Sequence, residues 1–258
     1  MATARTLYRL DRGYVTVAGP EAADFLERML SNEVVSLEPG EARPALLLTP
    51  KSRIVAPLRV LREGAEAFLL LTESSLAETV SSTLLRARFA AKCEIEVKHY
   101  RGYLQLGAGD GVPNGDYGVE AYESWSEDER DAADPAELEA LRIEAGTPAW
   151  GKELDGTILP AEAGLDETHV SFTKGCYPGQ EPIARLHFRG RANRRLHVLE
   201  VAGAKPGDEI VHDGKVVGRV TSAAAGRALG YVRRDVPDEA ALSIEGQDAR
   251  LHLATARP

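Results

Sequence analysis

Cysteine is scarce in this chain, and long apolar runs are missing. The 258 residues include only two cysteines, Cys93 and Cys176. Two thiols cannot build a disulfide framework, and they lack the paired spacing of a zinc site, so we expect no bound metal. A chain with free thiols is typical of a reducing compartment, and we expect the cytoplasm. No apolar run is long enough to span a membrane, and no signal-peptide core follows residues 1–5.

Positive charge is also in short supply. The chain carries 31 lysines and arginines against 40 acidic residues, a net charge of −9. This balance argues against a surface for DNA or for an anionic membrane. Residues 185–195 depart from it, because they hold five arginines, one histidine and no acidic side chain. This arginine strip is either a solvated linker or a docking site for an anion, since arginine suits carboxylates.

What the chain does have is one loop that combines turn-forming residues with a thiol. Residues 174–181 read Lys-Gly-Cys-Tyr-Pro-Gly-Gln-Glu. Gly175, Pro178 and Gly179 predict a turn. The next residues predict a short helix, with Pro182 in its first turn, where the missing N–H has no partner to lose.

The thiol of this loop, Cys176, is the first candidate functional group. It would lie just ahead of a helix N-terminus and near Lys174, and both features favour the thiolate. Glu181 and Arg185 stand one helical turn apart and are expected to pair. The alternative is that Cys176 is a buried, inert filler of a tight loop.

Alternating strands and helices in the remaining chain predict an α+β fold. A helix begins near Pro20, another follows a capping box formed by Ser75 and Glu78, and a third opens at Pro135. The acidic residues 123–134 are expected to form a loop. Strands are predicted at residues 6–18, 45–48, 53–61, 67–71, 94–97, 103–106 and 117–121.

Short strands separated by tight turns dominate the last part of the chain and predict a small β-barrel or sandwich. We place the domain boundary in the arginine strip, which gives an α+β region at residues 1–188 and a β-barrel domain at residues 189–258. The predicted strands of the second domain cover residues 196–201, 209–212, 216–221, 229–232, 242–244 and 250–253.

The loop motif Lys-Gly-Cys-Tyr-x-Gly-Gln-Glu resembles the signature of YgfZ-type folate-binding proteins, which are relatives of the glycine-cleavage aminomethyltransferases. The likeness covers roughly the last 120 residues at several motifs, whereas the first 120 agree mainly in element order. The other matching segments are residues 142–146 (Arg-Ile-Glu-Ala-Gly), 150–154, 160–165, 218–222 and 229–232.

The resemblance implies a fold of two interleaved α+β lobes and a C-terminal β-barrel, arranged as three lobes around a central cleft. It implies tetrahydrofolate, or a derivative, as the cofactor. It also implies a role in iron–sulfur cluster assembly or repair, with client or assembly proteins as partners, and hence support of iron–sulfur enzymes that modify tRNA. Cys176 would be the functional thiol, assisted by Lys174.

The folate ring needs a carboxylate for its N–H donors and a flat apolar wall. The matching position in the family motif implies that Glu144 is the carboxylate, and Trp150 can supply the wall. The alternative is a structural ion pair between Arg142 and Glu144. The arginine strip would meet the glutamate tail of the folate. We expect three more residues around the loop to contact the cofactor: Tyr177, Gln180 and Arg185.

One departure from the aminomethyltransferase pattern limits the expected chemistry. Ala56 and Pro57 stand where those enzymes carry a catalytic aspartate, and neither side chain can move a proton or hold an amine. We therefore expect a folate-binding accessory protein. A folate-dependent aminomethyltransferase and a pure interaction module remain the alternatives. We expect His169 and His187 to be surface or satisfied residues.

Overall fold

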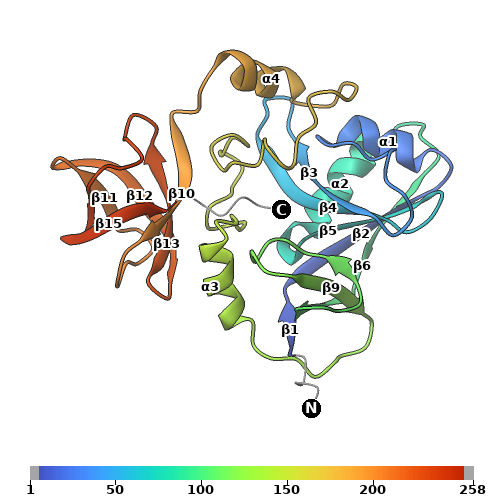
Figure 1. The fold of residues 1–258 in the computed structure, drawn as a ribbon. Helices are drawn as coiled ribbons and strands as arrows, with labels where there is room; N and C mark the ends of the chain where they lie inside the picture. The colour runs from blue at the N-terminus through green and yellow to red at the C-terminus, as the bar shows by residue number, and fades with distance from the viewer. Residues whose placement is uncertain (1–5, 253–258) are drawn as a thin grey trace.

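The computed structural model describes residues 6–252 and consists of two open sheets, a closed barrel and four α-helices. Figure 1 shows the barrel on one side, the two open sheets on the other, and α3 with irregular chain between them. The helices are α1 (Ala22–Met29), α2 (Ala77–Ala87), α3 (Ala136–Glu144) and α4 (Gln180–Arg189), and a short 3-10 helix, Ser74–Leu76, precedes α2.

The larger open sheet is antiparallel, with the strand order β3-β4-β5-β2-β6. Apolar side chains of α1, such as Phe25, and of α2, such as Val80 and Leu84, join those of the strands in one buried core. Amphipathic helices pack on a sheet in this way because burying their apolar stripe stabilises both elements. The strands are β2 (Arg12–Ala18), β3 (Ala42–Leu48), β4 (Ile54–Arg62), β5 (Ala67–Glu73) and β6 (Glu94–Lys98).

The smaller open sheet is interleaved with the larger one along the chain. Its strand order is β1-β7-β9-β8, so the chain passes from one sheet to the other between β1 and β2 and returns between β6 and β7. The two interleaved lobes implied by the resemblance are thereby confirmed. The strands are β1 (Leu7–Leu10), β7 (Arg101–Leu106), β8 (Val112–Pro113) and β9 (Ala121–Ser126).

The C-terminal strands close into a six-stranded barrel in the order β10-β13-β12-β11-β14-β15. The expected barrel or sandwich is therefore a barrel. It begins at Arg194, five residues after α4 ends, and the division into domains at residue 188 stays a prediction. The strands are β10 (Arg194–Glu200), β11 (Glu209–His212), β12 (Lys215–Ala224), β13 (Arg227–Arg233), β14 (Leu242–Ile244) and β15 (Gln247–His252).

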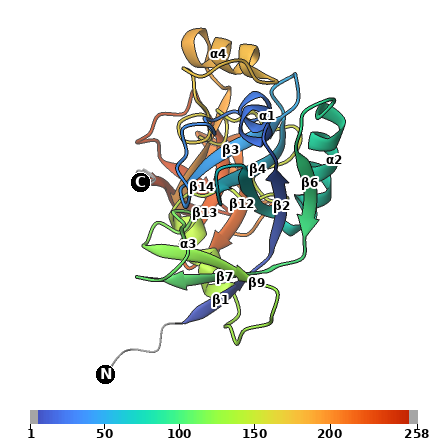
Figure 2. The ribbon, with the colours of Figure 1, turned by 90° about the vertical axis from the view of Figure 1, so that its right-hand side faces the viewer.

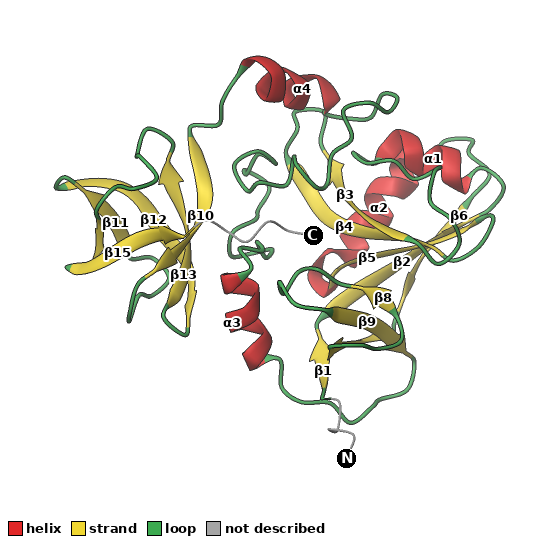
Figure 3. Ribbon diagram, viewed as in Figure 1, coloured by secondary structure: helices red, strands yellow, loops and turns green. Residues whose placement is uncertain are grey.

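A buried polar network joins α3, the irregular chain after it and the barrel. Glu153 is fully buried, and its carboxylate accepts hydrogen bonds from Arg142 Nη1 (2.8 Å) and Ser222 Oγ (2.6 Å). Tyr231 Oη donates to the backbone oxygen of Glu153 at 2.8 Å. A buried charge is tolerated when it is paired and hydrogen-bonded, so this contact fixes the barrel against the central segment. Figure 3 shows that loops make up most of this segment.

Two of the predicted local structures are wrong. Residues 117–120 of the strand expected at 117–121 form a loop, in which Gly118 has a positive φ, and the strand runs instead from Ala121 to Ser126. Glu123, expected in an acidic loop, is fully buried in β9 because Arg12 neutralises it.

The capping box expected at Ser75 and Glu78 is also absent from the described chain. Leu76 occupies the N-cap position of α2 and makes no side-chain capping hydrogen bond, and Ser75 belongs to the preceding 3-10 helix. The helix is there because its apolar side chains pack on the sheet, and it does not depend on a cap.

Candidate functional site

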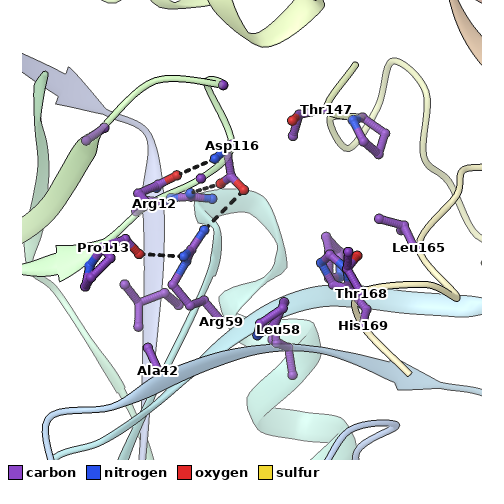
Figure 4. Close-up of a pocket in the computed structure, with 18 of the residues that line it drawn as sticks. Arg12, Ala42, Leu58, Arg59, Pro113, Asp116, Thr147, Leu165, Thr168 and His169 are labelled. Carbon is purple, nitrogen blue, oxygen red and sulfur yellow. Dashed lines mark hydrogen bonds and ion pairs between the residues drawn. The ribbon is translucent and has the colours of Figure 1, made fainter. Parts of the chain in front are cut away.

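A cavity of about 560 Å³ lies between the larger sheet, the loop of residues 113–120 and the central segment. Apolar side chains of β4 and of the central segment form part of its wall, among them Pro57, Leu58 and Leu165. Its polar lining includes Arg12, Arg59 and Asp116, and Figure 4 shows these three side chains directed toward one another on one side of the cavity. Cavities of this size and mixed lining are typical of small-molecule sites.

Asp116 links the two arginines of the cavity. Arg12 Nη2 lies 3.2 Å from its Oδ2, and Arg59 Nη2 lies 3.1 Å from its Oδ1. Burial alone would raise the pKa of Asp116, but the charges of Arg59 and Arg12 outweigh burial and lower the pKa to about 2. The carboxylate is therefore ionised at neutral pH and holds both guanidinium groups in place.

Arg12 is further fixed by the buried Glu123. Its Nε lies 3.0 Å from Glu123 Oε1, and Asn114 Nδ2 donates to Glu123 Oε2 at 2.8 Å. Arg12 also faces Glu73 directly across the antiparallel pair of β2 and β5. Burial would lower the pKa of Arg12, but Glu123, Asp116 and Glu73 together raise it well above its ordinary value.

Three buried polar atoms of the cavity have no hydrogen-bond partner within residues 6–252. They are Glu73 Oε2, Arg59 Nε and Thr147 Oγ1. Native proteins rarely leave such atoms unpaired, because each one loses its hydrogen bonds to water without compensation. All three belong to residues that line the cavity. A second cavity, of about 450 Å³, adjoins the first, since Glu73 and Thr147 line both.

Cys176 and Lys174 belong to the same loop, but Cys176 is exposed and the side chain of Lys174 is buried. Cys176 is exposed, and it lies four residues ahead of the first residue of α4. The Lys174 ammonium is turned into the protein, where it donates to the backbone oxygens of Glu27 (2.6 Å), Leu30 (3.0 Å) and Asn32 (2.7 Å). These three bonds use all its donors. Lys174 thus anchors the loop to the end of α1, and its ammonium is not directed at the thiol.

The other three residues predicted to contact the cofactor are one buried tyrosine and two residues of α4. Tyr177 is buried in an apolar cluster, where burial raises the pKa of its hydroxyl to about 12. Gln180 is half-buried and begins α4. Arg185 is exposed on α4, and the expected ion pair with Glu181 does not form in the described structure. None of these three side chains lines either cavity.

Glu144 and Trp150 also lie outside the lining of both cavities. Glu144 is the last residue of α3 and is exposed, whereas Thr147 and Pro148 just after it do line the cavity. The alternative ion pair with Arg142 is wrong, because Arg142 binds Glu139 and Glu153 instead. Trp150 is half-buried between two apolar clusters, and its backbone N–H contacts Glu73 Oε1 at 3.4 Å.

The arginine strip is partly neutralised. Arg194 pairs with Glu162 and Arg195 pairs with Glu167. The remaining three arginines, Arg185, Arg189 and Arg191, are exposed and make no ion pair in residues 6–252. The exposed half of the strip lies on and just after α4, and Figure 2 shows α4 at the end of the molecule opposite the smaller sheet. The sequence interpretation as an anion-docking site stays a prediction.

Sequence reasoning missed the polar residues of the cavity, including Glu73, Asp116, Thr147 and His169. The turn of Asn114, Gly115 and Asp116 was a weak sign of a binding site, because it places two polar side chains directly after β8. Glu73 also ends a strongly apolar strand. His169, expected to be a surface or satisfied residue, lines the cavity, with its Nδ1 2.7 Å from Thr168 Oγ1.

Within residues 6–252, no group of three or more histidine, cysteine or acidic side chains is arranged to hold a metal ion. In the same part of the chain, no helix has the length and apolar character needed to cross a membrane.

Comparisons with known proteins agree with this architecture. The family described as "CAF17, C-terminal beta-barrel domain" matches residues 193–257. The iron-sulfur cluster assembly factor IBA57 of mouse mitochondria is 29% identical over an alignment of 278 positions, which covers 86% of this chain and 74% of that protein. The tRNA-modifying protein YgfZ of Edwardsiella ictaluri is 26% identical over an alignment of 303 positions, which covers 96% of this chain and 90% of that protein.

The fold is also that of a solved structure. The glycine cleavage system aminomethyltransferase T of Bartonella henselae matches with a TM-score of 0.84 at 19% identity, covering 96% of this chain and 85% of that one. Such low identity shows the fold alone. The predicted fold class is confirmed, with its C-terminal barrel. Taken with the sequence matches, this confirms the predicted relationship: the chain is a homologue of the YgfZ and IBA57 proteins and has the fold of aminomethyltransferase T.

Proposed function

We propose that this protein binds tetrahydrofolate, or a derivative, and supports iron–sulfur cluster assembly or repair in the cytoplasm, with Cys176 as its functional thiol. The proposal draws on two homologues, one called an iron-sulfur cluster assembly factor and the other a tRNA-modifying protein. The observation that carries it is the cavity of about 560 Å³ with its unpartnered polar atoms. Client or assembly proteins would be the macromolecular partners.

The cavity fits a reduced folate in its chemistry. Pro57, Leu58 and Leu165 offer apolar surface for the flat ring. The unpartnered atoms of Glu73, Arg59 and Thr147 offer an acceptor, a donor and a hydroxyl for the polar groups of the ring. When bound, a reduced folate supplies ring nitrogens that can carry a one-carbon unit. The residues of this chain would bind and orient the ring and keep water from it.

Aminomethyl transfer is the less favoured alternative. Ala56 is fully buried in the core, and Pro57 is part of the cavity wall, so β4 offers no acid at the expected position. We expect no turnover of tetrahydrofolate with an aminomethylated carrier protein. Release of ammonia and formation of methylenetetrahydrofolate at rates well above a protein-free control would favour the enzyme instead.

The role of Cys176 can be tested by its reactivity. Cys176 is exposed, whereas Cys93 is buried and burial raises the pKa of its thiol. Iodoacetamide at pH 7.5 should therefore modify Cys176 in the native protein, and Cys93 only after unfolding, as read by mass spectrometry of the peptides. A Cys176→Ala variant that fully supports iron–sulfur enzyme activity in cells without the native gene would remove the thiol from the proposal.

The central experiment is a titration with tetrahydrofolate under anaerobic conditions, followed by calorimetry and by tryptophan fluorescence. Trp150 and Trp125 are the two tryptophans of the chain. A Trp125→Phe variant leaves Trp150, whose backbone N–H contacts the cavity residue Glu73, as the reporter. We expect saturable binding with one site and a fluorescence change in both proteins. Absence of saturable heat up to millimolar ligand would show that the protein does not bind the cofactor.

A further inference from the structure

Helix α4 is the least buried of the α-helices that the structure describes. Only Ile183 of its ten residues is buried, whereas α1, α2 and α3 bury three or four residues each. Ile183 joins the apolar cluster that also contains Tyr177. Figures 1 and 2 both show α4 at the outer edge of the molecule. One side of α4 therefore fixes the helix to the protein, and its other side is open to solvent.

An aromatic side chain stands on this open side. Phe188 is 68% exposed, and its ring centroid lies 5.0 Å from that of His187 and 5.7 Å from that of Phe172, edge to face in both pairs. Phe172 and His187 stack at 4.0 Å, and Phe172 packs against the same apolar cluster as Ile183. A lone exposed ring needs no explanation, but two further rings hold this one in place. A partner that packs on it would lose little side-chain entropy.

Free positive charge surrounds the exposed ring. Arg185 and Arg189 lie one helical turn apart, and Phe188 is three residues from the first and adjacent to the second, so all three share a face of α4. Arg191 follows directly after the helix and is also exposed. These three arginines make no ion pair in residues 6–252, and none of them lines either cavity. Their charge is directed to solvent.

The composition of this surface favours a protein partner over a nucleic acid. Arginine and aromatic residues are enriched at protein interfaces and lysine is depleted, and residues 185–195 contain five arginines and no lysine. Three free guanidinium groups on a chain of net charge −9 would make few phosphate contacts. Guanidinium groups suit carboxylates, which they can bind through two parallel hydrogen bonds. An acidic protein segment therefore fits best.

We propose that Phe188 and the arginines Arg185, Arg189 and Arg191 form a docking surface for an acidic segment of a partner protein, in which carboxylates flank one apolar side chain. The apolar side chain packs on the Phe188 ring, and the carboxylates pair with the arginines. The exposed Cys176 lies in the loop that leads into α4, so the partner would dock on the same loop and helix as the thiol. The surface itself does not depend on folate, and only its use for an iron–sulfur client or assembly protein rests on the proposed function.

The test measures the binding of fluorescein-labelled peptides, in which aspartates and glutamates flank one leucine, phenylalanine or methionine, by fluorescence anisotropy. We expect at least one peptide to bind wild type saturably, with a dissociation constant on the order of 100 μM or tighter. Phe188→Ala and Arg189→Glu should each weaken this binding roughly 5- to 30-fold. Thermal unfolding checks that each variant is folded.

The end of α2 provides matched controls. Phe89 is 92% exposed but makes no ring contact in residues 6–252, and Arg86 lies in the last turn of its helix, as Arg189 does. Phe89→Ala and Arg86→Glu should each change peptide binding by less than about twofold. Losses in these controls as large as those at Phe188 and Arg189 would mean unspecific attraction and would overturn the inference.

Two other probes decide between partner classes. Peptides with asparagine and glutamine in place of the acids should not bind, and equal binding would show that the arginines play no part. No saturable binding of any acidic peptide would also contradict the proposal. A labelled oligouridylate that binds wild type more tightly than the peptides, and loses this binding in Phe188→Ala, would identify the surface as a nucleic-acid site instead.

The peptide assay contains no folate, so it separates this inference from the proposed function. If the peptides bind and tetrahydrofolate does not, the docking surface stands and the proposed function fails. The combined variant of Phe188→Ala and Arg189→Glu should bind tetrahydrofolate as wild type does, yet lower iron–sulfur enzyme activity in cells without the native gene. Full activity of this variant would show that the surface does not serve an iron–sulfur partner.

Discussion

Ser52 Oγ donates a hydrogen bond of 2.7 Å to the backbone oxygen of Gly179, across 127 residues of sequence. Ser52 is fully buried in the hairpin between β3 and β4, and Gly179 is the N-cap residue of α4. Gly179 has a φ of 84°, and a Cβ there would lie 2.6 Å from Thr49 O. The hairpin and the Cys176 loop are therefore packed backbone to backbone, which leaves no room for a side chain.

Gly179→Ala should consequently destabilise the protein. The substitution adds both a positive-φ strain and a steric clash with backbone, and we expect a loss of about 1–3 kcal/mol in the free energy of unfolding. The matched control is Gly175→Ala in the same loop, where an added Cβ would meet nothing within 4 Å. Urea denaturation followed by circular dichroism measures both. Equal stability of the two variants would contradict this close packing.

Lys174 gives a second prediction, because its side chain is almost completely buried beside Glu27 and three backbone oxygens. Lys174→Met removes the donors and leaves these acceptors unsatisfied, so we expect a loss of about 2–4 kcal/mol. The exposed Lys51 is the matched control, and Lys51→Met should change stability by less than about 0.5 kcal/mol. Denaturation curves provide the measurement.

The Lys174→Met variant also tests whether Lys174 anchors the loop or activates the Cys176 thiol. Since the ammonium is bound to the end of α1, the rate at which native Cys176 reacts with iodoacetamide should change by less than about twofold in Lys174→Met. The rate must be measured at low temperature, where the variant remains folded. A slowing of tenfold with the fold intact would restore Lys174 to its predicted role beside the thiol.

Local sequence signals predicted the helices and the barrel because those elements depend on nearby residues. The apolar spacing of α2 and the short strands between tight turns after Arg195 are examples. The loop of Gly175, Pro178 and Gly179 was also visible as a turn. The failed capping box at Ser75 shows the limit of this approach, since tertiary packing sets where a helix begins.

The cavity could not be predicted in the same way. Arg12, Glu73, Asp116, Thr147 and His169 come from five separate segments, and they meet only because β2 pairs with β5 and the loop before β9 folds over the sheet. No single segment shows a pattern that reveals the others. The motif around Glu144 indicated only the end of α3, which lies next to the cavity. That Glu73 Oε2 has no hydrogen-bond partner depends on the positions of its neighbours in the fold, which no local pattern indicates.

The ion pairs of Asp116 predict how stability depends on pH. The ordinary pKa of this carboxyl is 3.8, and in the folded protein the pKa is about 2. Because the folded pKa is the lower one, the ionised carboxylate stabilises the fold fully above about pH 4, and this contribution is lost as the pH falls towards 2. Replacing Asp116 with Asn removes the charge at every pH, and we expect a loss of about 1–3 kcal/mol at pH 6.

The difference in stability between wild type and Asp116→Asn should therefore shrink steadily between pH 4 and pH 2. Urea denaturation at several pH values measures it, and subtracting the two curves cancels the titration of the other carboxylates. The exposed Asp131 provides the control, since Asp131→Asn should differ little from wild type over the same range. A difference for Asp116→Asn that stays constant down to pH 2 would mean that the Arg12 and Arg59 charges do not stabilise the ionised carboxylate, and that the two arginines are held in the cavity by their other contacts.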